Sequence, residues 1–231
     1  MSLIHDFFAE IDDQWPHEGS KTRLSIIGCG ALMLQIDYER GTKDGDVFET
    51  LDLSAEIKTQ LVALAGPGSK LHARRKLYID IVKNGIPFLP HVPRWNPVRF
   101  DDELHHFEVV ALDVVDVVVS KLKRFSANDQ ADIDAMVARE LVQHHHLIER
   151  FRSAVDNWLG DAREVDLPKY VDNLHRRARH AWCRRDRDRA AVVDLTWYLV
   201  RHGHPRNDAR DVPGVRRGAR LPARPDDRSA R

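Results

Sequence analysis

The sequence is poor in cysteine and has no long apolar run. Only two of its 231 residues are cysteines, Cys29 and Cys183, which is too few for a disulfide framework or a cysteine-based zinc site. No stretch approaches the roughly 18 consecutive apolar residues that a membrane-spanning helix requires. The N-terminal residues have neither the basic region nor the long apolar region of a secretory signal. We therefore expect a cytoplasmic protein with no membrane partner.

An excess of charge of either sign is also absent. Lys and Arg together number 36, as do Asp and Glu, so the formal net charge is zero. This balance excludes a strongly basic footprint for nucleic acid over the whole protein, although a local basic patch is compatible with it. With 42% hydrophobic and 31% charged residues, the composition is that of a globular protein with one core and a small second lobe.

Apolar periodicity predicts mixed structure over the first 125 residues and helices after them. Helical spacing predicts a helix over 2–15, and a short β-branched run over 24–27 has the length of a strand. Gly28-Cys29-Gly30 then predicts a turn before a helix over 31–36. Further strands are expected over 47–51, 76–82 and 106–112, helices over 54–65, 114–125, 128–141, 146–159 and 169–182, and a loop over 84–101.

These elements predict an α+β fold, with a small mixed β-sheet flanked by helices and followed by a helical C-terminal lobe. We expect an α/β core over residues 1–125, a helical lobe over 126–182 and an Arg-rich, partly disordered tail over 183–231. The tail fits either a solvated extension or a basic arm for RNA or DNA. Its Asp residues dilute the positive charge, which favours the solvated extension.

Two aspartates two residues apart form the first candidate site. Asp44 and Asp46 stand at the entrance of a predicted strand, where residues i and i+2 point to the same face. Two carboxylates that close repel unless a cation lies between them, and Mg²⁺ prefers carboxylate and phosphate oxygens. Asp80 lies within an apolar strand pattern, where a lone charge is costly unless it is paired or bound to metal; there it would allow a second metal ion. Taken alone, Asp44 and Asp46 also fit a solvated turn, and Asp80 a buried partner of an arginine.

The segment Gly28-Cys29-Gly30 is the second candidate site, because it joins a predicted strand to a predicted helix. Backbone N–H groups at such a junction bind phosphate without any basic side chain, and glycine permits a close approach of the backbone. The spacing differs from the dinucleotide fingerprint, and no Gly-Lys-Ser/Thr follows it. Neither a Rossmann site nor a P-loop is therefore indicated.

Together these motifs resemble the polymerase-β-like nucleotidyltransferase superfamily. The matching stretches are Ile-Ile-Gly-Cys-Gly-Ala-Leu over 26–32, Arg-Gly-Thr-Lys-Asp-Gly-Asp-Val over 40–47, and a downstream element with Lys-Leu-Lys-Arg over 121–124 and Asp-Gln-Ala-Asp-Ile over 129–133. The closer resemblance is to small bacterial members: the AbiEii toxin-like group and an uncharacterised nucleotidyltransferase family of the DUF6036 kind. It covers roughly residues 20–140.

The resemblance implies an enzyme that transfers a nucleoside monophosphate from an NTP to an acceptor hydroxyl on a protein, a tRNA or a small molecule. Two Mg²⁺ or Mn²⁺ ions would assist, and a toxin–antitoxin pairing with a cognate antitoxin or regulator is implied as well. Asp129 and Asp132 would be structural or second-site acids; without the resemblance, Lys121 also fits a solvated helix face or a contact with RNA phosphates. The implied catalytic and metal-binding residues are Asp44, Asp46 and Asp80, with Asp80 as a base, and the implied nucleotide- and phosphate-binding residues are Gly28, Cys29, Gly30, Arg40, Thr42 and Lys121.

Three departures from the superfamily pattern support a second interpretation. Cys29 stands where a second Gly or a Ser is usual, and Gly45 replaces the usual apolar residue between the aspartates, which predicts a more loosely held strand. Asp52 or Asp101 competes with Asp80 for the place of the third carboxylate. The second interpretation is a catalytically degraded nucleotide-binding protein or an antitoxin-like partner protein.

Overall fold

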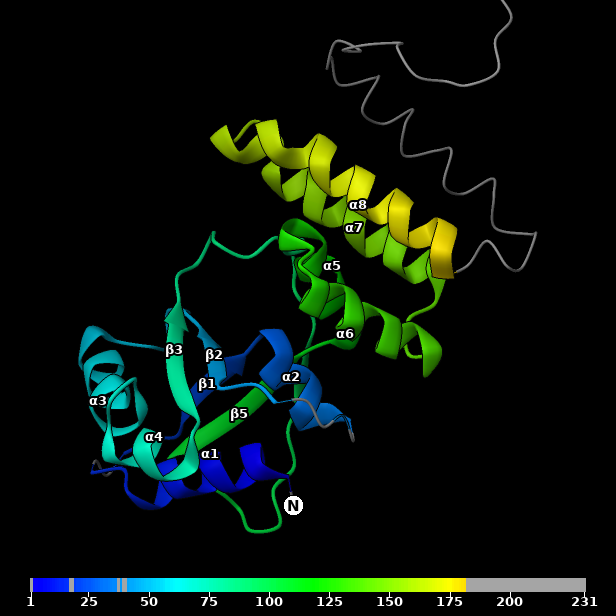
Figure 1. The fold of residues 1–231 in the computed structure, drawn as a ribbon. Helices are drawn as coiled ribbons and strands as arrows, with labels where there is room; N and C mark the ends of the chain where they lie inside the picture. Colours follow the sequence, from blue (N-terminus) through cyan, green and yellow to red (C-terminus); the bar gives the residue numbers. More distant parts are fainter. Residues whose placement is uncertain (1, 17–18, 37, 39–40, 182–231) are drawn as a thin grey trace, which may run out of the picture.

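A five-stranded mixed sheet lies at the centre of the computed structural model, which describes residues 2–16, 19–36, 38 and 41–181 (Figure 1). The strand order is β3-β2-β1-β5-β4; β1 runs parallel to β5 and antiparallel to β2, β2 is parallel to β3, and β4 is antiparallel to β5. The strands are β1 (Thr22–Ile26), β2 (Asp44–Phe48), β3 (Tyr78–Val82), β4 (Trp95–Pro97) and β5 (Phe107–Leu112). The tail expected over 183–231 lies outside the described residues.

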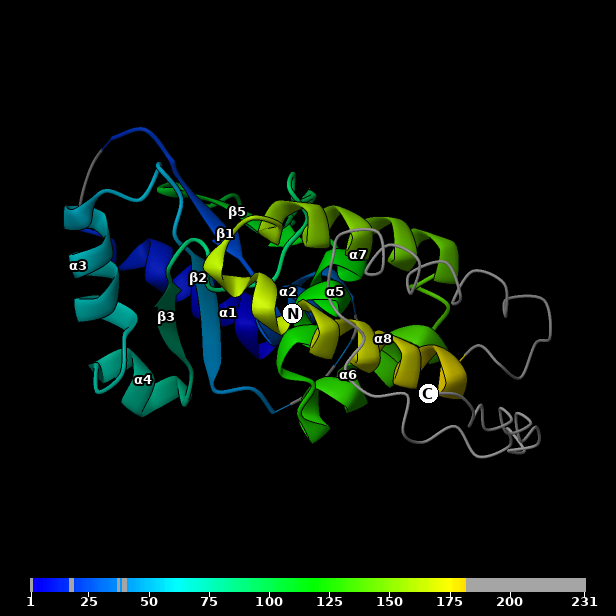
Figure 2. The same cartoon turned by 90° about the horizontal axis from the view of Figure 1, so that it is seen from above.

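Helices lie on both sides of this sheet. In Figures 1 and 2, α3 and α4 lie on one side and α5 to α8 form a lobe on the other, while α2 contacts both β5 and α5. The α-helices are α1 (Leu3–Asp13), α2 (Gly28–Gln35), α3 (Ala55–Ala65), α4 (Lys70–Arg75), α5 (Val114–Arg124), α6 (Ala127–Ala138), α7 (His144–Trp158) and α8 (Leu167–Ala181), with a 3₁₀ turn, η1 (Ala162–Asp166), before α8. None of the helices in the described part of the chain is both long enough and apolar enough to cross a bilayer. The mixed fold with a helical C-terminal part, expected from the sequence, is confirmed.

Two predictions near the candidate site are wrong in detail. Gly28 to Gly30, expected as a turn, are the first residues of α2, because β1 passes into the helix through Ile27 alone. The strand expected from residue 47 begins at Asp44. Both aspartates therefore lie inside β2, where hydrogen bonds to neighbouring strands hold their backbone.

Two short elements were not predicted. Helix α4 has six residues, too few to show an apolar period, and its N-terminus is capped by Ser69, whose hydroxyl oxygen accepts the N–H of His72 at 3.0 Å. Strand β4 has three residues and lies inside the proline-rich segment expected as a loop. Its Pro97 is tolerated because β4 is an edge strand, where a missing N–H leaves no ladder bond unmade.

Helix α1 packs against β2 between the two aspartates. A Cβ atom built on Gly45 would lie 3.4 Å from Cδ1 of Ile79 and 3.7 Å from Cζ of Phe8 on α1. The space beside Gly45 is therefore filled by neighbouring side chains, and the strand is closely packed there. A glycine lets α1 approach β2 while the aspartates on either side point to the opposite face.

The connection between β3 and β4 attaches the sheet to the helical lobe. Its Phe88 is fully buried, with ring centroids 5.4 Å from Phe151, 5.3 Å from Trp158 and 5.0 Å from Tyr170. The ammonium of Lys123 lies 4.7 Å from the Trp158 ring centroid. Aromatic packing of this kind adds to the apolar burial, so the lobe is held against the sheet from two sides, through α2 and through this connection.

A buried ion pair inside the lobe yields a stability prediction. Asp116 is fully buried and accepts hydrogen bonds from Nε and Nη2 of Arg150, each at 2.6 Å, and from the N–H of Arg94 at 2.8 Å. Asp116→Ala leaves the Arg150 guanidinium buried without its partner, so we expect the free energy of unfolding to fall by about 3–5 kcal/mol in urea titrations.

Glu149→Ala is the control for this substitution. Glu149 pairs with the Arg94 side chain at 3.9 Å, and both side chains are largely exposed. We expect its loss to change the free energy of unfolding by no more than about 0.5 kcal/mol. Equal effects of the two substitutions would contradict a stabilising role for the buried pair.

Candidate functional site

Three aspartates share one face of the sheet on two neighbouring strands. Asp46 is the register partner of Asp80 in the parallel β2–β3 pair, and Asp44 that of Tyr78. Register partners point to the same face, so the side chains of Asp44, Asp46 and Asp80 project from the same side. Asp80 is exposed, so the alternative of a buried partner of an arginine is wrong.

Asp46 carries the electrostatic consequence of this clustering. Burial, followed by the negative charges of Asp44 and Asp80, raises the pKa of Asp46 to about 6, and the positive charges of Lys121 and Arg124 oppose this rise. The carboxylate is thus held where like charge and lost hydration both disfavour its ionised form. Neither of the two competitors for the third position, Asp52 and Asp101, is among the charges that act on the pKa of Asp46.

The start of α2 lies directly against Asp46. Gly28 has φ +66°, and a Cβ built on it would lie 2.5 Å from Oδ2 of Asp46, closer than any real Cβ contact. The N–H of Ile27 donates to the backbone C=O of Asp46 at 2.9 Å, which fixes the helix start to β2. The N-terminus of α2 therefore begins beside the carboxylates, and the positive end of a helix dipole is a place for anions.

The start of α2, Asp44 and Asp46 line a cleft of about 900 Å³ between the sheet and the lobe, whereas Asp80 is not among its lining residues. Of the residues expected in phosphate binding, Gly28, Cys29, Thr42 and Lys121 line it, as do Asp44 and Asp46. Arg40 lies outside the described residues. The remaining lining residues are Ile27, Gly41, Lys43, Tyr78, Val82, Ile86, Pro87, Ser120, Lys123, Arg124, Asn128, Asp129, Asp166, Lys169 and Tyr170.

The structure does not bring Gly30 to this cleft. A Cβ on Gly30 would meet Cδ1 of Ile4 at 3.3 Å and Cγ2 of Ile26 at 3.4 Å, so the residue packs on α1 and β1. The helical geometry separates it from Gly28 by about 200°, since successive residues turn by about 100°. At position 30 a glycine leaves room for the side chains of Ile4 and Ile26, whereas at position 28 it leaves room for the carboxylate of Asp46.

A hydroxyl orients the first aspartate. Oγ1 of Thr42 donates to Oδ1 of Asp44 at 2.6 Å, just before β2 begins. One carboxylate oxygen of Asp44 is thereby engaged. The sequence resemblance implied that Thr42 binds nucleotide or phosphate, and in the structure its hydroxyl contacts Asp44 directly.

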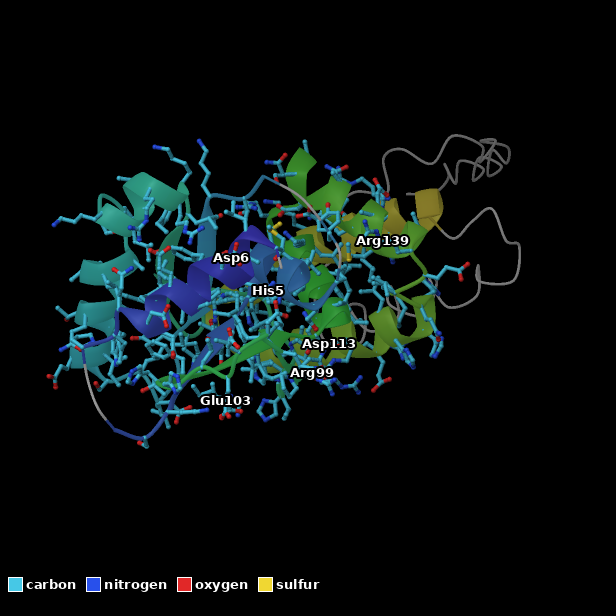
Figure 3. All side chains as sticks on the ribbon, turned by 90° about the horizontal axis from the view of Figure 1, so that it is seen from below. His5, Asp6, Arg99, Glu103, Asp113 and Arg139 are labelled. Atoms are coloured by element: carbon cyan, nitrogen blue, oxygen red, sulfur yellow. The ribbon has the colours of Figure 1, made fainter. Side chains whose placement is uncertain are left out.

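Lys121 lies in the opposite wall, on α5, and is almost entirely buried. Its Nζ lies 2.7 Å from Oδ2 of Asp132 and 3.5 Å from Oδ1 of Asp129. The other oxygen of Asp132 accepts the hydroxyl of Tyr38 at 2.8 Å, and the guanidinium of Arg139 lies 5.3 Å from the Tyr38 ring. Arg139, which is labelled in Figure 3, directly follows α6. Lys121 therefore joins α5 to α6 and, through Asp132, to the segment that precedes β2.

Asp129 organises the junction between α5 and α6. It accepts from Nε and Nη2 of Arg124 at 2.7 and 2.9 Å and completes a capping box with Ser126. Burial alone would raise the pKa of Asp129, but the hydrogen bonds from Arg124 and Ser126 and the charge of Lys121 hold it well below its usual range. Asp129 and Asp132 are thus structural acids beside the cleft.

Several cleft residues escaped the sequence analysis. Tyr78, Asn128, Lys169 and Tyr170 line the cleft but belong to no motif. The spacing Ser126-x-x-Asp129 is a readable signal for the start of α6, and it locates Arg124 at the preceding helix end. The lobe residues carry no such signal, because only tertiary packing brings α8 to the sheet.

The donor atoms suit a divalent cation. Asp44 and Asp46 provide carboxylate oxygens on one strand face, their like charges repel each other, and Gly28 leaves open the space beside Oδ2 of Asp46 that a Cβ would fill. One or two carboxylates completed by substrate phosphates are typical ligands of Mg²⁺. Across the described ranges, no three His, Cys, Asp or Glu side chains lie close enough together to hold a metal ion by themselves.

The contact at Gly28 yields a prediction with a matched control. Gly28→Ala adds a Cβ at a positive φ and against Asp46, so we expect the free energy of unfolding to fall by about 2–4 kcal/mol in urea titrations. Gly68→Ala carries only the backbone cost of about 1 kcal/mol, because its φ is +84° and nothing lies within 4 Å of the added Cβ. Equal losses in both variants would show that the Asp46 contact has no energetic effect.

The raised pKa of Asp46 predicts a pH-dependent stability of the metal-free protein. Protonated Asp46 stabilises the fold below pH 3.8, its ordinary pKa, and this contribution is lost as the pH rises through about 6. In EDTA at pH 7.5, Asp46→Asn should therefore raise the free energy of unfolding by about 1–2 kcal/mol, allowing for partial solvent screening. Near pH 4 the variant and the wild type should be alike.

Asp52→Asn is the control, because Asp52 is an exposed turn residue. We expect no change in thermal or urea stability from it at either pH. A gain from Asp46→Asn that is the same at pH 4 and pH 7.5 would contradict an ionisation effect and indicate a change in packing.

Comparison with known proteins identifies the family of the chain. Comparison with curated proteins and with solved structures gives no match. Residues 4–176, which are 173 of the 231 residues, match the family described as a nucleotidyltransferase of unknown function (DUF6036). The match includes the β1–α2 junction, the aspartates of β2 and β3, and the α5–α6 wall of the cleft. The chain therefore belongs to the DUF6036 family of nucleotidyltransferases.

Proposed function

We propose that this protein transfers a nucleoside monophosphate from an NTP to an acceptor hydroxyl in the cleft between β2, β3 and α5. One observation carries the proposal: Asp44, Asp46 and Asp80 share a strand face directly beside the start of α2. Carboxylates beside a helix N-terminus combine a place for divalent cations with a place for phosphate. Membership in a nucleotidyltransferase family agrees with this chemistry.

Asp44 and Asp46, with Asp80 beside them, would hold Mg²⁺ or Mn²⁺. A bound divalent ion supplies neutralisation of phosphate charge and a lower pKa for the acceptor hydroxyl. Thr42 keeps one oxygen of Asp44 in place through its 2.6 Å hydrogen bond. The raised pKa of Asp46 supports the proposal, because a neighbouring cation would favour the charged form that burial, Asp44 and Asp80 disfavour.

The reaction that we propose exchanges a phosphoanhydride bond of the NTP for a phosphate ester bond to the acceptor. The acceptor oxygen forms a bond to the α-phosphorus, the bond from that phosphorus to the bridging oxygen breaks, and pyrophosphate leaves with the electron pair. The hydroxyl proton passes to the carboxylate of Asp80, whose exposure allows it to pass the proton to water. The N-terminus of α2, which begins at Gly28, orients the phosphates, so most of the rate acceleration would come from positioning and electrostatics.

The acceptor and the biological setting are proposed from the sequence resemblance. The acceptor is a hydroxyl of a protein, a tRNA or a small molecule, and the AbiEii-like motifs support a cytoplasmic toxin–antitoxin pair with a cognate antitoxin or regulator. Growth arrest on expression, relieved by Asp46→Asn, is the outcome that this setting predicts.

A second candidate function is nucleotide binding without catalysis, as in a regulatory or antitoxin-like partner. The exposure of Asp80 favours it, because a solvated carboxylate at the sheet edge is less firmly positioned than Asp46. The two functions differ in whether bound NTP is ever converted to pyrophosphate.

The test is calorimetric titration of the four NTPs into the purified full chain, with and without Mg²⁺. We expect one or more NTPs to bind only with Mg²⁺, and Asp46→Asn to weaken this binding at least about tenfold, since it removes a charge from the cation site. Asp52→Asn is the matched control and should bind as the wild type does.

The same samples are then assayed for pyrophosphate release with protein, tRNA and small-molecule acceptors. Mg²⁺-dependent binding together with release that Asp46→Asn abolishes supports the transferase. Binding without release from any acceptor favours the second candidate. A folded wild-type protein that binds no NTP contradicts both.

A further inference from the structure

Two cationic side chains one turn apart on α5 differ in their exposure to solvent at the cleft. Lys121 is 7% exposed and lies between Asp132 and Asp129, whereas the Arg124 side chain is 74% exposed. Residues i and i+3 lie on one helix face, so both side chains belong to the same wall. Both line the cleft that contains Asp44 and Asp46.

The charge of Lys121 is already matched. Its Nζ has one carboxylate at 2.7 Å and a second at 3.5 Å, and both carboxylates are buried. Moving this ammonium to a phosphate would leave Asp132 as a buried charge without its cation, which costs several kcal/mol in general. Lys121 is therefore held in place as a connection within the lobe.

Arg124 is both exposed and fixed. Its Nε and Nη2 donate to the two oxygens of Asp129, and Asp129 is itself held by the N–H and hydroxyl of Ser126 at 3.0 and 2.8 Å. Among the described residues, Nη1 makes no hydrogen bond. The guanidinium is thus anchored on one side, and its remaining donors are available to a ligand without loss of the anchor.

The field of Arg124 reaches the candidate metal site. After its hydrogen bonds to Asp129, the carboxylates of Asp46 and Asp44 act to raise the pKa of Arg124, and Arg124 in turn lowers that of Asp46. The aspartates come from the sheet and Arg124 from the end of α5, so acidic and basic groups meet across one cleft. A ligand that fits this cleft carries phosphates that contact Arg124 and binds the cations that the aspartates hold.

We infer that Arg124 binds the terminal phosphates of the NTP, the part that leaves as pyrophosphate, and that Lys121 is a positioning residue which does not touch the nucleotide. This inference rests on the proposed function and adds a leaving-group subsite to it. The reacting phosphate must lie near the carboxylates, and the β- and γ-phosphates then extend to the anchored guanidinium. Arginine suits this role because its planar donors match phosphate oxygens.

The leaving-group subsite affects the step in which negative charge develops on pyrophosphate. When the bond from the α-phosphorus breaks, negative charge develops on the departing pyrophosphate, and a preset cation stabilises that charge more than the ground state. Arg124 should therefore affect kcat as well as NTP affinity. A purely structural role would affect neither selectively.

The experiment compares Arg124→Gln with Arg94→Gln by calorimetry on the full chain in Mg²⁺. Arg94 is a matched control, because its side chain is exposed, pairs with one glutamate at 3.9 Å and does not line the cleft. The probes are the tightest-binding NTP, the corresponding NMP and inorganic pyrophosphate. For Arg124→Gln we expect NTP and pyrophosphate to bind about 10–100-fold more weakly and NMP to change less than twofold, as loss of a charged contact predicts. Arg94→Gln should leave all three unchanged.

Two further measurements distinguish a direct contact of Arg124 with phosphate from a purely structural role. Arg124→Lys keeps the charge but loses the paired anchor to Asp129, so its NTP affinity should fall between wild type and Arg124→Gln. A circular dichroism spectrum and melting temperature like those of wild type for Arg124→Gln attribute the binding loss to the contact.

Three outcomes would overturn the inference. They are unchanged NTP and pyrophosphate affinity in Arg124→Gln, an equal loss of NTP and NMP affinity, and wild-type protein that binds neither NTP nor pyrophosphate; the last also removes the proposed function. Wild-type protein that binds pyrophosphate through Arg124 but no NTP would keep the phosphate subsite and contradict the nucleotide-binding function alone.

Discussion

The candidate site depends on the close approach of Gly28 to Asp46. A helix that begins one residue after β1 ends can lie against the neighbouring strand only if its first residue has no side chain there, and Gly28 meets this condition at a positive φ. The N–H of Ile27 bonded to the backbone of Asp46 holds the two elements together. The positive end of α2 and the carboxylates of β2 are therefore neighbours by construction of the backbone, before any ligand binds.

This arrangement has an energetic cost that the rest of the fold offsets. Asp46 is disfavoured as an ion by burial and by Asp44 and Asp80, and only the more distant charges of Lys121 and Arg124 oppose that effect. The lobe is rigid where these cations are placed, through the capping box at Ser126 and the packing of Phe88 between α7 and α8. Sites that bind charged ligands commonly retain such unfavourable interactions, and neighbouring elements compensate for them.

Much of the sheet and of its acidic site could be predicted from the sequence, because the evidence is local. Spacing alone places Asp44 and Asp46 on one strand face, and a glycine after a strand marks the phosphate site. Asp80 was identified by strand pattern but for a mistaken reason, since burial in an edge strand depends on which strands pair, and that is a tertiary property. Gly30 was assigned to the ligand although it packs on α1, because a glycine does not reveal which neighbour requires its small size.

The sequence also does not reveal the different roles of the two cations on α5. Lys121 and Arg124 stand three residues apart in one motif, and nothing in their sequence spacing separates a buried structural ammonium from an exposed guanidinium. The distinction comes from α6: Asp132 projects to Lys121, while Asp129 is used as a cap and holds Arg124 at the helix end. Since α6 turns away directly after Ser126, the cation nearer that turn remains at the surface and the one a turn earlier becomes buried. The division of roles along α5 is therefore a consequence of where the helix ends.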